Sequence, residues 1–151
     1  MASVVDTSVK WAHSGQIGSM VLTGAPGSKV ALLRAFLVDG WGLKSVDSLV
    51  TSSGVATITV TGTHPAQVDT VILVDGVTGA LTALNGEQKV TAVTGSTISF
   101  ATAAANGTAA GSITTKMAPA GWSMPFSATN VGVFRSDDVT SNRRFVRIAD
   151  T

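Results

Sequence analysis

Cysteine and tyrosine are both absent from this chain of 151 residues, and charged residues make up only 13% of it. Without cysteine, the chain has no disulfide, no thiolate metal site and no thiol nucleophile. Ten basic residues against nine acidic ones give a net charge of +1, which offers no electrostatic footprint for nucleic acid. The longest helix-like apolar segment, residues 30–38, spans about 13 Å, too short to cross a bilayer. We therefore expect neither nucleic acid nor membrane as a partner.

The low charge is combined with a mean hydropathy of +0.37. A freely soluble monomer ordinarily carries more charge, so we expect part of the surface to be covered by other copies or other proteins. The first ten residues lack the basic start and long apolar core of a secretion signal. We therefore expect the protein to assemble in the cytoplasm of the cell that makes it.

One stretch of the chain is typical of a helix. Its apolar residues at helical spacing are Val30, Leu32, Leu33, Phe36 and Leu37. Ser28 precedes the stripe as a candidate N-cap, and Gly40 follows it as a candidate left-handed C-cap. The sequence thus predicts one short core helix over about residues 29–38.

The rest of the chain favours β-structure. Residues 55–61 alternate strictly between apolar and polar side chains, the period of a strand with one buried face. Further short strands follow, separated by glycine turns, and Asn85-Gly86 is typical of a hairpin turn. The predicted fold class is mainly β: a small β-barrel or sandwich with one short core helix and extended arms.

The predicted domain organisation is discontinuous. Residues 1–53 plus 117–151 would form a base domain that carries the helix, and residues 54–116 a small β-module. One continuous domain is the alternative. The segment after the module contains Pro119 and Pro125, which argue against regular strand pairing, together with apolar residues unsuited to a free linker. We expect it to be an extended strap docked on its own core or on a neighbour's.

No arrangement of residues predicts catalysis. His13 and His64 are isolated, without a second histidine or a carboxylate at metal-ligand spacing. Asp137 and Asp138 are adjacent, so on an extended chain they point to opposite faces, and a turn-capping role is the better interpretation. Neither a nucleophile elbow nor a phosphate-binding loop is present. We expect no enzyme, no cofactor and no metal site.

Arginine gathers near the end of the chain among aspartates, and two interpretations stand at even odds. The arginines either form internal pairs on a solvated hairpin, or meet carboxylates of a neighbouring subunit across an interface. Exposed tryptophans would also suit a receptor- or carbohydrate-binding module. The candidate interface residues are Trp11, Trp122, Met124, Phe126, Arg135, Arg143, Arg144 and Arg147.

Two stretches resemble known proteins. His64-Pro65, the apolar strand 71–74 with its glycine turn, Leu84-Asn85-Gly86 and the strands that follow resemble a small β-module common in tailed-phage structural proteins. That module is similar to the first catalytic cysteine half-domain fold of ubiquitin-activating enzymes. This chain has Ala66 where an aromatic residue is usual, and it has no cysteine, so no thioester chemistry is implied.

The flanking segments resemble a more specific group. Residues 6–15, 27–44, 118–122 and the ending 147–151 are similar to phage and prophage proteins whose genes lie among virion genes. The resemblance implies a virion structural protein that forms homo-oligomers and contacts the major capsid protein or other virion proteins. Within the virion a capsid decoration or cement protein is favoured, with a neck, tail or baseplate component as the rival.

Overall fold

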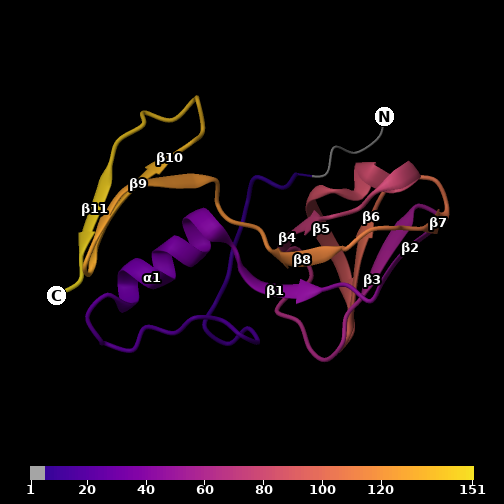
Figure 1. Ribbon diagram of the computed structural model, residues 1–151, viewed down its shortest axis with the longest axis horizontal. Coiled ribbons are helices and arrows are strands. Elements are labelled where there is room, and N and C mark those ends of the chain that lie inside the picture. The colour runs from indigo at the N-terminus through magenta and orange to yellow at the C-terminus, as the bar shows by residue number, and fades with distance from the viewer. Residues whose placement is uncertain (1–5) are drawn as a thin grey trace. The chain divides into compact units, whose positions relative to one another are not determined.

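The computed structural model describes residues 6–151, which form two compact units (Figure 1). Residues 6–19 and 42–118 make up the first unit, and residues 20–41 and 119–151 the second. An eight-stranded antiparallel sheet dominates the first unit, and a three-stranded antiparallel sheet with one helix makes up the second. The predicted mainly β fold class is confirmed.

The first unit is built on a sheet with the strand order β1-β8-β4-β5-β6-β3-β2-β7. The strands are β1 (Trp41–Ser45), β2 (Ser48–Ser52), β3 (Val55–Thr59), β4 (Val71–Asp75), β5 (Gly86–Val93), β6 (Thr97–Ala101), β7 (Gly107–Thr108) and β8 (Thr114–Met117). β5 pairs with β4 through its first half and with β6 through its second half. β1 and β7 lie at opposite ends of this order, so no closed barrel forms within residues 6–151.

The two halves of this sheet, β1-β8-β4 and β6-β3-β2-β7, are joined by β5 and share one core. Ile58 and Phe100 on one half and Ile72 on the other have almost no exposed surface. Ile72 and Ile98 line the same small cavity, which shows that side chains of the two halves meet. Burial of each such side chain contributes roughly 1.5–3 kcal/mol to folding. The buried apolar side chains of the strands therefore hold the two halves of the sheet together.

The predicted hairpin turn at Asn85-Gly86 is wrong. A 3₁₀ helix, η2 (Gly79–Leu84), connects β4 to β5, and Gly86 already belongs to β5. Leu81 and Leu84 are buried, which holds the connection against the core. The Asn85 side chain accepts a hydrogen bond from the Val77 N–H at 2.9 Å and donates one to the Val77 carbonyl at 2.8 Å. Asn85 thus ties the long connection together instead of forming a tight turn.

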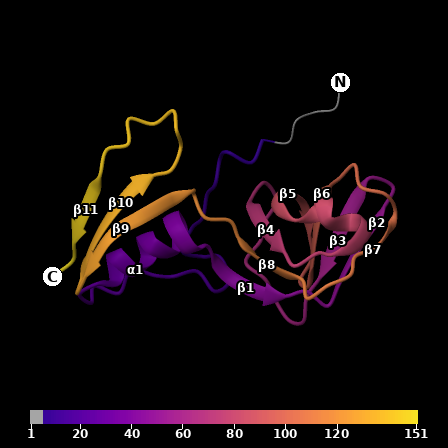
Figure 2. The same cartoon turned by 45° about the horizontal axis from the view of Figure 1, so that its top comes forward.

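The second unit places one helix against the sheet β11-β10-β9. Its elements are α1 (Ser28–Arg34), its π-helical continuation η1 (Ala35–Asp39), β9 (Trp122–Ala128), β10 (Val131–Ser136) and β11 (Val146–Ala149). A Cβ atom at Gly132 would lie 3.0 Å from Val30 Cγ1, so α1 packs directly on β10. The helix follows one face of the sheet, and no other helix or strand of this unit covers the opposite face (Figure 2).

The predicted helix is present, but its N-terminal cap is not Ser28. Gly27 occupies the cap position with φ of 86°, and no cap side chain bonds the first turn. Asp150 supplies that acceptor instead: its Oδ2 takes the Lys29 N–H at 2.8 Å, and its carbonyl takes the Gly27 N–H at 2.9 Å. No residue of α1 or η1 is fully buried, because one thin sheet covers only one side of the helix.

The predicted strap is a paired strand over part of its length. β9 pairs with β10 from Ala128 to Phe126, and pairing resumes at Ser123 beyond a bulge. Pro125 falls within that bulge, on an edge strand, where its missing N–H breaks no ladder. The prediction that proline prevents strand pairing in this segment was therefore wrong for β9.

The division between the units differs from the predicted domain boundaries. Residues 42–53 lie in the first unit, because β2 pairs with β3 along its whole length. Whether the segments 1–53 plus 117–151 and 54–116 fold separately stays a prediction.

Candidate interaction surfaces

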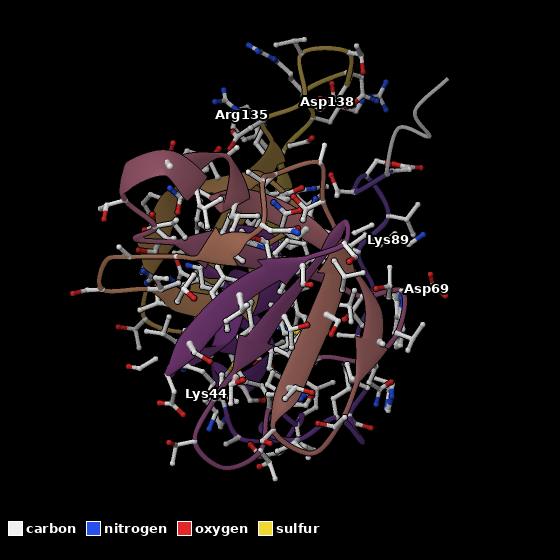
Figure 3. All side chains as sticks on the ribbon, turned by 90° about the vertical axis from the view of Figure 1, so that its right-hand side faces the viewer. Lys44, Asp69, Lys89, Arg135 and Asp138 are labelled. Carbon is white, nitrogen blue, oxygen red and sulfur yellow. The ribbon has the colours of Figure 1, made fainter. Side chains whose placement is uncertain are left out.

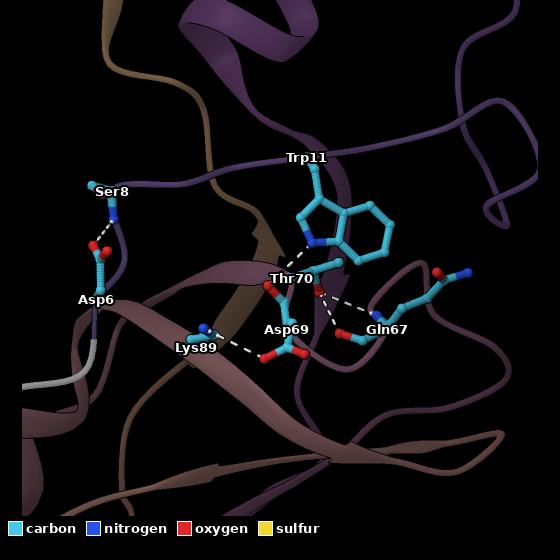
Figure 4. A network of polar contacts seen from close by, with 7 residues as sticks. All are labelled: Asp6, Ser8, Trp11, Gln67, Asp69, Thr70 and Lys89. Atoms are coloured by element: carbon cyan, nitrogen blue, oxygen red, sulfur yellow. Dashed lines mark hydrogen bonds and ion pairs between the residues drawn. The ribbon is translucent and has the colours of Figure 1, made fainter. Parts of the chain in front are cut away.

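Trp11 is held on its own unit by a short polar network (Figure 4). Its indole N–H donates to the Asp69 carbonyl at 3.2 Å, and its ring stacks on His13 with centroids 6.0 Å apart. Asp69 lies in a turn and pairs with Lys89, with Oδ1 and Nζ 3.4 Å apart. Only 39% of Trp11 is exposed. The residue therefore anchors the N-terminal segment, in keeping with an arm docked on a core.

Two further contacts fix the same segment. Lys10 Nζ lies 3.1 Å from Glu87 Oε1, and the buried Gln16 side chain donates to the Pro65 carbonyl at 3.3 Å. After these anchors, large apolar side chains are exposed in a stretch without strand or helix. These exposed residues are Ile17, Met20, Val21 and Leu22.

The outer face of the small sheet, defined here by Phe126, Val133, Arg135, Phe145 and Arg147, collects several predicted interface residues. Val133 is directly opposite Phe126 on β9 and Arg147 on β11, so these three side chains form one row. Phe126 is 55% exposed and Phe145 is 60% exposed. This face is turned away from α1, because the helix packs on the alternate residues Gly132 and Phe134.

Arg135 is the most constrained arginine of this outer face. Its Cζ lies 5.7 Å from the centroid of the Phe145 ring, within cation–π range. Its Nε is buried and has no hydrogen-bond acceptor among residues 6–151. Arg135 leaves the end of β10 that leads into the 137–145 connection, where Asp138 also lies (Figure 3). The guanidinium is therefore oriented by an aromatic ring and still lacks an acceptor.

The predicted internal pairing of arginines and aspartates does not occur within residues 6–151. The ion pairs found there join Lys10 with Glu87, Lys29 with Asp150, Arg34 with Asp39, and Lys89 with Asp69. Asp150 is thus engaged at the start of α1. Arg135, Arg143, Arg144 and Arg147 have no carboxylate partner among these residues.

The remaining predicted interface residues are placed elsewhere. Trp122 is paired with Ser136, and Met124 lies in the β9 bulge; both are half-buried. Arg143 and Arg144 are exposed in the connection before β11. Phe145 was not among the candidates, although the alternation of residues 145–148 already placed it on the face of Arg147. Its exposure was the missing information, since exposure depends on which side the helix covers.

Asp138 caps the turn after β10, as predicted. Its Oδ1 accepts hydrogen bonds from the N–H and the hydroxyl of Thr140, both at 2.8 Å. These bonds hold the pKa of Asp138 below its ordinary value. The bonds from Ser8 likewise lower the pKa of Asp6. The adjacent aspartates thus shape a turn, and no shared proton is needed to explain them.

Replacing Thr140 with alanine is expected to raise the pKa of Asp138 part of the way toward its ordinary value, because the backbone N–H bond remains. The hydrogen bonds of the turn favour the ionised form of Asp138. Their contribution to folding stability is therefore present above the ordinary pKa of this carboxyl and is lost as the pH falls through its lowered pKa. Carboxyl NMR during a pH titration measures the pKa of Asp138 in each variant. Ser141→Ala is the control; an unchanged pKa in Thr140→Ala would contradict the assignment.

The inner cavity of the first unit is too small for an organic ligand. Its volume is about 10 Å³, and His64 and Thr115 are among its lining residues. The His64 Nε2 lies 2.9 Å from the Thr94 carbonyl and 3.1 Å from the Thr97 carbonyl, so it carries the proton and donates. The histidine is therefore part of the core. Within residues 6–151, no group of three His, Asp or Glu side chains is arranged to hold a metal ion.

Similarity assigns no family to this chain. It matches no protein-family model, no curated protein and no solved structure. No helix within residues 6–151 is long and apolar enough to span a membrane. The resemblance to virion proteins stays a prediction.

Proposed function

We propose that this chain is a non-enzymatic structural protein of a tailed-bacteriophage virion, acting as a capsid decoration or cement protein that clamps shell subunits. It works by surface contact with the major capsid protein and with other copies of itself, in the particle, without cofactor, nucleic acid or membrane. The virion assignment rests on the sequence resemblance, and the mode of action rests on the structure's surfaces.

The observation that carries the proposal is the outer face of the small sheet. Phe126 and Phe145 are more than half exposed there, beside arginines without carboxylate partners. Aromatic residues and arginine are enriched at the centres of protein interfaces, where they contribute most of the binding energy. The exposed apolar stretch around residues 17–22 adds a second contact region. Both features suit a protein whose surface is completed by neighbours.

The alternatives are separated by how often the chain occurs in the particle. A neck, tail or baseplate component would use the same kinds of surface, but in few copies. A carbohydrate-binding module is less favoured, because the Trp11 ring is stacked on His13 and its indole N–H is already bonded.

Quantitative mass spectrometry of purified particles tests this function by counting the chain against the major capsid protein. We expect a ratio near one or a simple fraction of it, which corresponds to shell decoration. About six or twelve copies per particle would move the chain to the neck or tail. Absence from particles would overturn the virion role.

A further inference from the structure

The outer face of the small sheet has a definite chemical character. Its middle row is Phe126, Val133 and Arg147, and the next row is Arg135 with Phe145. Val133 and Arg135 lie on the central strand and the two aromatic rings on either side of it, so apolar side chains and guanidinium groups are interspersed across the face. Such a surface matches a partner that presents both apolar side chains and carboxylates.

The charge of this region differs in sign from that of the rest of the chain. Residues 131–149 carry four basic and two acidic residues, whereas the remainder carries six basic and seven acidic ones. All four basic residues in this region are arginines, and every lysine of the chain lies outside it. A guanidinium presents a planar fork that matches a carboxylate with two parallel hydrogen bonds, which an ammonium cannot do. The same fork also matches phosphate, so arginine indicates an anionic partner, and the exposed apolar side chains of this face favour an acidic protein surface.

Two other occupants suit the face less well. A second copy would bring the same arginine-rich surface, and like charges brought together disfavour association. Single-stranded nucleic acid would need aromatic rings free for base stacking. One of the two exposed rings, Phe145, already has the Arg135 guanidinium over it.

We infer that the outer face of the small sheet binds an acidic protein surface that also presents apolar side chains, whose carboxylates pair with Arg135 and Arg147. Arg135 and Arg147 have no carboxylate partner among residues 6–151, and carboxylates of the bound protein would supply one to each. This inference rests on the proposed function, since it states the chemistry of the neighbouring virion protein that the chain would clamp.

The test titrates the full chain with a synthetic peptide of alternating glutamate and valine. Backbone-amide NMR of the full chain measures the binding. We expect shifts confined to β9, β10 and β11, and about tenfold weaker binding for Arg135→Gln plus Arg147→Gln, the effect of losing two ion pairs. Lys44→Gln plus Lys89→Gln removes the same charge from the first unit and should bind like the unchanged protein. The thermal unfolding of each variant confirms that it is folded.

Three results would overturn the inference. A lysine–valine peptide bound as tightly as the glutamate–valine peptide would show that carboxylates are not recognised. Tighter binding of a ten-nucleotide oligothymidine would show that the face takes nucleic acid. A dimer in sedimentation that dissociates in the Arg135→Gln plus Arg147→Gln variant would assign the face to a second copy. Particle counting is independent: peptide binding by a chain absent from particles would refute the virion role and leave this inference standing.

Discussion

Replacing Phe134 with alanine is expected to destabilise the second unit by about 3–5 kcal/mol. Phe134 has no exposed surface, and it lies on the face of β10 against which α1 packs. It is the largest fully buried side chain of this unit, and no residue of the helix is fully buried to compensate for its loss. The cavity left by the ring would therefore remove most of what holds helix and sheet together.

The matched control for this change is Phe126→Ala on the opposite face of the same sheet. Phe126 is 55% exposed, so its removal should change stability by no more than about 0.5 kcal/mol. Amide hydrogen exchange of β9 and β10 measures both variants without assuming that the two units unfold together. Equal protection in the two variants would show that Phe134 does not hold this unit together.

Replacing Gly76 with alanine is expected to destabilise the first unit by about 3–4 kcal/mol, because overpacking is added to backbone strain. Gly76 has φ of 86°, a conformation that costs alanine energy by itself. A Cβ there would also overlap the carbonyl oxygen of Ser112. That obstacle is backbone, which cannot move aside as the end of a flexible side chain can.

Gly79→Ala separates the two contributions. Gly79 has a similar φ of 74°, but a Cβ there would have no atom within 4 Å. Its replacement should therefore show strain alone, about 1–2 kcal/mol. Urea unfolding followed by amide NMR of β4 and β8 compares the variants. If both lost the same stability, the close approach of the chain at Ser112 would be irrelevant.

Local sequence patterns were sufficient to predict most elements. Alternating side chains located β3, and helical spacing located α1 and η1 to within a residue or two. The predictions that were wrong concerned features set by residues far apart in the sequence. Asp150 caps the helix by accepting from Lys29, which lies 121 residues earlier in the chain, and no local pattern indicates this. Pro125 is tolerated only because β9 is an edge strand with a bulge.

The candidate site shows the same limit. Composition singled out Phe126, Arg135 and Arg147, which do share one face, but it also included Trp11, which lies in the other unit. Cross-strand register decides which of these residues are neighbours, and register depends on pairing between distant segments. Phe145 was overlooked because its exposure depends on which face of the sheet the helix covers.

The discontinuous course of the chain also sets an order of events during synthesis. The helix leaves the ribosome before residues 42–118, and the sheet that covers it is made only afterwards, roughly 4–15 s later at ordinary translation rates. Closing a flexible loop of that length costs roughly 4 kcal/mol of chain entropy. Because β1 and β8 are neighbours in the sheet, folding of the first unit closes that loop in advance. Folding of the larger unit first therefore lowers the entropy cost of bringing the helix and the small sheet together.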